Sequence, residues 1–377
     1  MPRQRAAAGV DPRVVVIMED SDRAKPLIAH LVLLGARVEV WDASTLLLDS
    51  AGPAPDLQAL YFCRTSPSAR TRGRDWAAAC TSRVLEWLES HGAHVVNGSR
   101  ALALEVCKWR QTRELARVGI ATPRTLLVGA SPQHTMVAVK EVLSERAQLP
   151  AVKPREAMLE PWDAWWIKPT HGGSGAGTMR VEEMAAFARA AEKEPQVLRD
   201  VFRRAPDNLL IVQKEAARPP RGQRGQHTGR RARFLRTFYR AEFVGAELMY
   251  VLRVVAVNTA VSACPCDKKT TGDVTYEVMR DPWTSLTDAG VGPRARARAQ
   301  WWRFCDACLA YMRNAGMAVG AFEFLVPRGG PPVVIDVNSN TNYGEGHERR
   351  AGVECGYRVL ARELTRQAVQ VASAQRA

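Results

Sequence analysis

Residues Phe322–Gly344 read FEFLVPRGGPPVVIDVNSNTNYG, two apolar segments joined by a turn of proline and glycine, which predicts a hairpin. The first segment carries Glu323, and the second ends at Asp336 and Asn338. Because side chains alternate across a strand, Asp336 and Asn338 share a face, and a Glu323 on that face would bring three oxygen donors together. Such hard oxygen donors suit Mg²⁺. A hairpin with an exposed polar face is the alternative, although acidic residues are disfavoured in strands.

A glycine-rich loop follows another expected strand, Trp165–Pro169, which carries Lys168 near its end. The backbone N–H groups of such a loop can wrap phosphates. The loop lacks the GK[ST] of a Walker A motif, and a strand at Thr178–Val181 follows it rather than a helix. The alternative is a simple glycine hairpin, which would leave the lysine unexplained. The candidate phosphate-binding residues of the loop are Gly172, Gly173, Ser174, Gly175 and Gly177.

Two more segments surround this motif. A helix expected at Arg100–Val118 carries Lys108 in its middle and leads through Gly119 to a strand at Arg124–Val128. A strand expected at Leu209–Gln213 continues into Lys214, Glu215 and Ala216. A helical lysine alone is usually solvated, so Lys108 gains interest only from its neighbours.

Strands expected at 234–240 and 243–257 form a hairpin around Gly245 and carry Arg236, Arg240 and Arg253. Arginine on an inner strand face can stabilise the charge of a transferring phosphoryl group, although arginine at a sheet edge is ordinary. Further elements are expected as a strand at Val274–Met279 and helices at Pro293–Ala315 and Gly356–Ser373.

Residues 13–62 alternate strand and helix, which predicts a parallel, Rossmann-like sheet. No GxGxxG follows its first strand, so we expect no dinucleotide there. The next loop, Arg64–Arg74, is either a site for an anionic substrate group or a solvated basic loop. A turn at Asn97–Ser99 would cap the helix after it.

The formal charge is +14, from 53 Lys and Arg against 39 Asp and Glu, which favours anionic partners. No nucleic-acid motif accompanies it, so a nucleic-acid partner is not expected. No apolar run is long enough for a membrane span, and no secretory signal is apparent, so we expect a cytoplasmic protein with reduced thiols. Zinc on Cys264, Cys266, Cys305 and Cys308 is an alternative to packing of the last two in a helix.

In this order the motifs resemble the ATP-grasp superfamily, and within it the RimK-like carboxylate–amine ligases, over about residues 101–346. The resemblance implies an α/β fold, α+β in its C-terminal part, with an N-terminal Rossmann-like pre-ATP-grasp lobe. It implies ATP-dependent joining of a small-molecule or peptide carboxylate to an amine through an acyl phosphate, with release of ADP.

The resemblance also implies roles for the residues. Lys108, Lys168 and the glycine loop would hold ATP phosphates, and the segment Gln213–Ala216 (Gln213, Lys214, Glu215, Ala216) would read adenine. Glu323, Asp336 and Asn338 would bind one or two Mg²⁺, with Mn²⁺ as an alternative ion, and Arg240, Arg253 or Arg236 would stabilise the phosphoryl group.

The expected organisation is a disordered tail at 1–12, a pre-ATP-grasp lobe at 13–98 and an ATP-grasp domain at 99–373. That domain divides into a central lobe at about 120–213 and a C-terminal lobe at about 214–373, with a mobile basic loop at 218–233. A non-catalytic ATP-binding or regulatory protein on this fold is the alternative function, and assembly into a homo-oligomer stays open.

Overall fold

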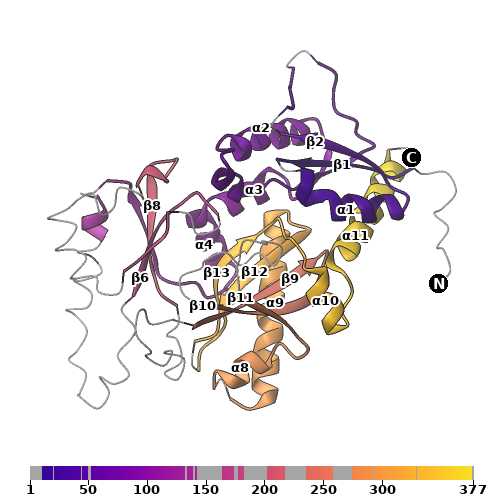
Figure 1. The fold of residues 1–377 in the computed structure, drawn as a ribbon. Helices are drawn as coiled ribbons and strands as arrows, with labels where there is room; N and C mark the ends of the chain where they lie inside the picture. Colours follow the sequence, from indigo (N-terminus) through magenta and orange to yellow (C-terminus); the bar gives the residue numbers. More distant parts are fainter. Residues whose placement is uncertain are drawn as a thin grey trace, which may run out of the picture.

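The computed structural model describes residues 11–19, 21–43, 45–49, 52–131, 134–138, 141, 164–173, 177–181, 202–216, 235–257, 274–290, 292–327 and 329–375. The expected loop 218–233 and most of the expected tail lie outside the described residues. The described strands form three sheets, and helices cover the N-terminal and central sheets (Figure 1). Among the described helices, none combines the length and the apolar character that crossing a membrane requires.

The N-terminal sheet confirms the predicted parallel alternation. Its order is β2-β1-β3-β4, with β1 (Arg13–Met18), β2 (Arg37–Asp42), β3 (Leu60–Cys63) and β4 (His94–Val96) all parallel. Helix α1 (Ser21–Leu33) covers one face and α2 (Ala77–Ser90) the other. Because both faces are covered, β1 and β3 are almost continuously apolar.

The last helix of the chain, α11 (Gly356–Ala374), also packs on this sheet. Its buried Leu360 and Leu364 share a core with Leu27 and Leu31 of α1, and Figure 1 shows the two helices side by side. The N-terminal sheet is therefore completed by the far end of the sequence, a segment that the expected organisation assigned to the C-terminal lobe.

The central sheet is antiparallel, in the order β11-β10-β9-β12-β13. Its strands are β9 (Leu235–Val244), β10 (Glu247–Val257), β11 (Val274–Met279), β12 (Val319–Leu325) and β13 (Val333–Asn338). Helix α9 (Arg294–Ala315) covers one face, where Trp301 packs among Phe304 and Phe324. The opposite face shares its core with α1 and α11.

Cys305 and Cys308 are buried in α9 within this aromatic core, as the packing interpretation predicted. Cys264 and Cys266, the other members of the alternative zinc set, lie outside the described residues.

The third sheet is small and antiparallel, in the order β5-β8-β6-β7. Its strands are β5 (Thr125–Gly129), β6 (Trp165–Pro169), β7 (Met179–Val181) and β8 (Leu209–Lys214). It has a core of its own around Ile167, Leu210 and Val212. Figure 1 shows it to one side of the central sheet.

Three short elements had no sequence prediction: η1 (Pro67–Arg72), α8 (Thr284–Asp288) and α10 (Glu345–Ala351). They span at most seven residues, too few for a helical period to show in the sequence. The observed elements with individually expected ranges lie within a few residues of those ranges, except the helix that carries Lys108.

Asn97 joins the first two sheets instead of capping a helix. Gly98 is the N-cap of α3 (Ser99–Val106), without a side-chain cap bond. The Asn97 amide is fully buried; Nδ2 donates to the carbonyls of Val319 (2.9 Å) and Ser339 (2.6 Å), and Oδ1 accepts from the N–H of Ala318 (2.9 Å). The predicted turn therefore supplies the N-cap through Gly98, whereas the Asn97 side chain satisfies backbone groups around β12 and β13.

We expect Asn97→Ala to lower the free energy of unfolding by about 3 kcal/mol or more, since it leaves several buried backbone groups without a partner. Asn208 has the same positive φ of 54° as Asn97 but is exposed. Asn208→Ala is therefore the matched control and should cost only about 1 kcal/mol, from backbone strain alone. Denaturant unfolding measures both variants; equal losses would contradict the bridging role.

Candidate active site

The three predicted oxygen donors meet on one face of the central sheet. In the β12–β13 pairing Glu323 lies opposite Asp336, and Asn338 lies opposite Ala321. Asn338 Nδ2 donates to Glu323 Oε1 at 3.3 Å. A bulge follows, because Phe324 pairs with Val334 and leaves one residue of β13 unpaired. The structure thus brings Glu323, Asp336 and Asn338 together as the sequence predicted, on strands that a core holds from behind.

Lys108 reaches this cluster. Its Nζ lies 2.7 Å from Asp336 Oδ1, and its side chain is 16% exposed. The sequence predicted Lys108 in the middle of a helix. The structure instead places it at the start of α4 (Lys108–Arg117), after a break at Cys107. Cys107 is extended and forms a β-bridge with His171, while Lys108 N donates to Thr170 O at 2.9 Å. The helix breaks because its backbone pairs with the segment that follows β6.

Arg240 of β9 completes the cluster. It lies opposite Glu323 in the sheet; its Nη1 donates to Glu323 Oε1 (2.9 Å) and its Nε to Glu242 Oε1 (2.6 Å). The residue is only 5% exposed. Burial would lower the pKa of Arg240, but the two carboxylates raise it, so the guanidinium stays charged. Burial raises the pKa of Glu323, against the opposing effect of Arg240.

The structure does not bring Arg253 to this cluster. Leu252 lies opposite Arg240, so the next residue along β10, Arg253, points to the other face of the sheet. There it is half-exposed and lies 3.5 Å from Glu277. The backbone of Arg236 belongs to β9, but its side chain lies outside the described part of the structure.

The segments expected to contact phosphates are β6 and the glycine loop after it. A backbone hydrogen bond links them to Lys108 of the cluster. Lys168 lies in β6, two residues before the carbonyl that accepts from Lys108 N. A Cβ at Gly173 would come within 2.8 Å of Ser68 N, so the loop approaches η1 too closely for a side chain. Gly172 and Gly177 are also described, but Ser174 and Gly175 lie outside the described residues.

The expected adenine-binding segment is the end of β8 and the residues after it. Gln213 is buried and donates to Thr125 Oγ1 at 2.9 Å. The N–H groups of Lys214 and Glu215 donate to the carbonyls of Arg124 and Ala164, both at 2.8 Å. The Glu215 carboxylate pairs with Arg180 at 2.8 Å, so neighbouring segments hold the backbone here on both sides. Ala216 follows and packs against the core that the central sheet shares with α1 and α11.

The arginine loop after β3 is not simply solvated, because Arg64, Arg70 and Arg72 have partners within the protein. Arg64 is buried; it donates to Thr341 O (3.1 Å) and Asn342 Oδ1 (2.7 Å), both shortly after the donors of β13. Arg72 pairs with the buried Glu19, and Arg70 lies 3.3 Å from Asp75. These arginines therefore hold the protein together, Arg64 by fixing the segment that follows β13.

Two carboxylates of this region were missed by the sequence analysis. Glu242 follows Arg240 at a spacing of two on one strand, and that alternation could have been noticed. Glu105 of α3 gave no signal, because its interest depends on tertiary contacts. It is 5% exposed, accepts from Ser339 Oγ, and burial raises its pKa to about 8.

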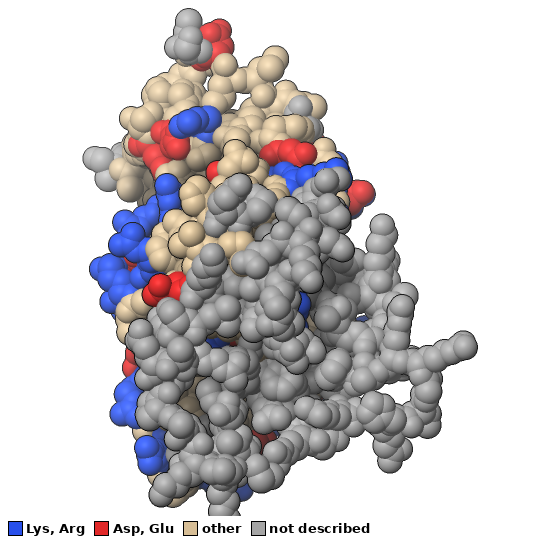
Figure 2. Space-filling view, turned by 90° about the vertical axis from the view of Figure 1, so that its left-hand side faces the viewer, with Lys and Arg blue, Asp and Glu red and all other residues tan. Residues whose placement is uncertain are grey.

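The cluster combines fixed positive groups with oxygen donors. Lys108 and Arg240 face three carboxylates, those of Glu242, Glu323 and Asp336. A surplus of carboxylate next to an amide fits a hard divalent cation such as Mg²⁺. Among the described residues seen in Figure 2, Lys and Arg gather along one side with Asp and Glu among them.

Comparison with solved structures identifies the fold. The D-cycloserine synthetase DcsG is 16% identical, with a TM-score of 0.56 over 94% of this chain and 99% of that chain. The ATP-grasp ligase PsnB, complexed with a phosphomimetic variant of minimal precursor, Mg and ADP, is 17% identical, with a TM-score of 0.52 over 95% and 99%. The RimK domain protein ATP-grasp from Sphaerobacter thermophilus is 16% identical, with a TM-score of 0.52 over 93% and 99%.

No protein-family model matches the chain, and the comparison with curated proteins finds no match. The structural matches cover nearly the whole chain, so it has the ATP-grasp fold. The predicted resemblance is thereby confirmed at the level of the fold.

The raised pKa of Glu105 makes the free energy of unfolding depend on pH. Its pKa is about 8 in the folded protein and about 4 when unfolded, so between these values the folded state binds the extra proton. Stability is therefore lost as the pH rises from about 4 to 8, by at most about 5 kcal/mol. We expect Glu105→Gln, which does not titrate, to gain stability over the unmodified protein as the pH rises through this range.

Denaturant unfolding at pH 5, 7 and 9, without nucleotide or metal, measures this difference. Glu86→Gln is the control, because Glu86 is on the surface and pairs with Arg83. A stability difference for Glu105→Gln that does not grow with pH would show that the Glu105 carboxyl ionises freely in the folded protein.

Proposed function

We propose that this protein is an ATP-dependent, ADP-forming ligase that joins a carboxylate to an amine through an acyl phosphate. One observation carries the proposal: Lys108 and Arg240 converge on Glu323, Asp336 and Asn338 on one face of the central sheet of an ATP-grasp fold. Phosphoryl transfer needs positioning and positive charge more than a nucleophilic side chain, and this cluster offers both.

Glu323, Asp336 and Asn338 are the proposed ligands of Mg²⁺, which when bound would neutralise the charge of the β- and γ-phosphates. The donor set supports this assignment, because it consists of two carboxylates and an amide on adjacent strands. The structurally similar PsnB is complexed with Mg and ADP, which is consistent with the assignment.

Lys108 is proposed to bind an ATP phosphate. Its ammonium pairs with Asp336, so nucleotide binding would exchange or share that partner. Lys168 and the glycine loop would hold further phosphates, and Gln213–Ala216 would contact adenine. Arg240 is proposed to stabilise the transferring phosphoryl group, with Glu242 fixing its orientation. Arg253 is left out of this set, because it lies on the opposite face.

The proposed reaction has two steps. A substrate carboxylate oxygen attacks the γ-phosphorus, and the bond from that phosphorus to the bridging oxygen breaks, which releases ADP. The amine then attacks the acyl carbon and expels phosphate, which retains the oxygen that came from the carboxylate. The neighbours include a D-cycloserine synthetase and a ligase complexed with a precursor, so small molecules and peptides are the substrate classes to test. We propose that the reaction takes place in the cytoplasm.

We expect Asp336→Asn and Asn338→Ala each to lower ATP turnover by at least about a hundredfold, because each removes a proposed ligand of the ion on the reacting phosphates. Turnover is measured as ADP formed from Mg-ATP with a pool of amino acids and small peptides. Glu277→Gln is the control: it makes a similar change on an exposed residue of β11 and should leave turnover unchanged.

Intact turnover in both variants would show that the site is assigned wrongly. ATP binding without any turnover by the unmodified protein, across a wide pool, would instead favour a non-catalytic ATP-binding protein.

A further inference from the structure

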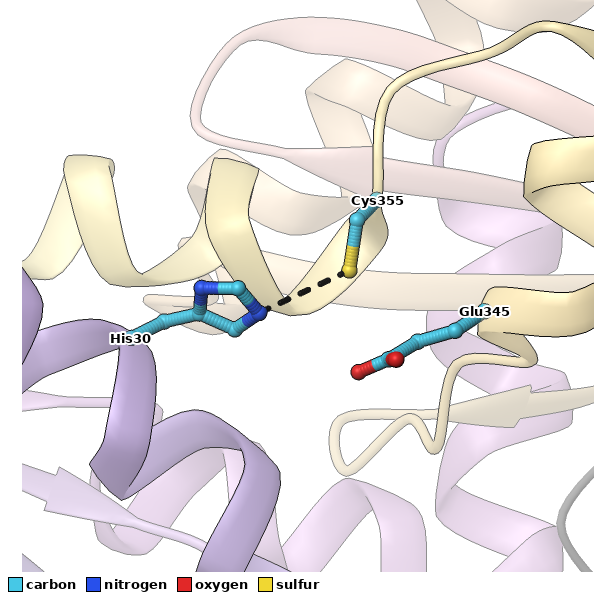
Figure 3. A group of neighbouring side chains, drawn as sticks. All are labelled: His30, Glu345 and Cys355. Carbon is cyan, nitrogen blue, oxygen red and sulfur yellow. Dashed lines mark hydrogen bonds between the residues drawn. The ribbon is translucent and has the colours of Figure 1, made fainter.

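A second cluster of possible metal ligands lies on other elements of the structure. It consists of His30 in the last turn of α1, Glu345 at the start of α10 and Cys355 at the N-cap of α11. Figure 3 shows the three side chains pointing toward a common space. Among the His, Cys, Asp and Glu side chains of the described residues, these three form the group that lies close enough together to hold one ion. They come from both ends of the chain.

The spacing of the donor atoms fits a tetrahedral ion. One ligand atom from each residue lies within 4.8 Å of the other two, and His30 Nε2 is 3.8 Å from Cys355 Sγ. Zinc bonds of about 2.3 Å to sulfur and about 2.1 Å to nitrogen place those two atoms about 3.6 Å apart in a tetrahedron. Only a small adjustment of the two side chains would therefore be needed.

The chemistry of the donors selects the ion. Imidazole nitrogen, cysteine sulfur and carboxylate oxygen are the ligands that Zn²⁺ takes in proteins. Mg²⁺ and Ca²⁺ prefer oxygen alone and would not select a site with a thiolate. The ligands His30, Glu345 and Cys355 therefore favour a different metal ion from the oxygen ligands Glu323, Asp336 and Asn338.

Glu348 supplies an independent observation beside this cluster. It is 2% exposed, and its Oε1 accepts from Tyr250 OH (2.6 Å) and Gly356 N (3.1 Å). The Cys355 thiol also lies against this carboxylate, and it would lose its proton on binding a metal ion. The other oxygen, Oε2, is buried and has no hydrogen-bond partner among the described residues. A buried carboxylate oxygen without a donor is destabilising, and a metal-bound water beside Cys355 would satisfy it.

We infer that His30, Glu345 and Cys355 form a zinc site, with a water molecule as fourth ligand that donates to Glu348 Oε2. The ion would tie α1 of the N-terminal lobe to the starts of α10 and α11. Because α11 completes the core of the N-terminal sheet, this tie stabilises the joint between the two ends of the chain.

The test uses the full-length, metal-free protein without nucleotide. Titration with Co²⁺ alone is expected to produce a thiolate-to-cobalt charge-transfer absorption that saturates at one equivalent and disappears when Zn²⁺ is added. Zn²⁺ alone should raise the thermal midpoint by about 3 °C or more. Cys355→Ser should abolish the absorption, and His30→Gln and Glu345→Gln should weaken cobalt affinity by at least about tenfold.

Cys80→Ser is the matched control, because Cys80 is also a half-buried thiol but donates to Ala43 O in another part of the fold. It should retain both the absorption and the Zn²⁺ shift. Glu345 is exposed, so Glu345→Gln tests the site even if the cysteine variant fails to fold. No absorption in the unmodified protein, an unchanged absorption in Cys355→Ser, or an unchanged cobalt affinity in Glu345→Gln would overturn the inference.

Discussion

The pairing of Arg240 with Glu323 and Glu242 is the interaction on which the candidate site depends. A charged group removed from water is tolerated only when it is paired with good geometry, and Arg240 is almost completely buried between two carboxylates. Those carboxylates belong to β9 itself and to the neighbouring β12. Any shift in strand register would leave a buried charge without its partner, so the register of the sheet and the arrangement of the site specify each other.

Buried polar side chains also fix the joint where the N-terminal lobe meets the central sheet. Asn97 and Arg64 come from the ends of parallel strands; Asn97 donates to carbonyls at the start of β12 and just after β13, and Arg64 donates to a carbonyl of the segment that follows β13. Helix α11 adds apolar packing to the same joint. The strands that carry the proposed metal ligands are thus held by their own sheet and by the adjoining N-terminal elements, which gives the site the rigidity that the proposed phosphoryl transfer would require.

Much of the fold could be predicted because its signals are local. The strands around 322–344 are apolar on both sides of a proline and glycine turn, and alternation along the second strand predicted that Asp336 and Asn338 share a face. That Glu323 joins them depends on the register of the hairpin, which the structure supplies. The break before Lys108 could not be seen, because Cys107 is extended only through its pairing with His171. The sequence also could not show that Arg240 and Arg253 lie on opposite faces of the sheet. Their relative orientation depends on the turn at Gly245 and on an irregularity between Leu248 and Tyr250. His30 and Cys355 are separated by most of the chain, so only the folded structure brings them together.

The central claim is that a substrate carboxylate attacks the γ-phosphate of ATP. The most direct measurement supplies Mg-ATP with a pool of amino acids and small peptides whose carboxylates carry ¹⁸O, and then determines the nucleotide product and the mass of the released phosphate. The account predicts ADP, phosphate that contains ¹⁸O, and a product lighter by one water than its two substrates. AMP that contains ¹⁸O would show adenylate chemistry instead and would contradict the account.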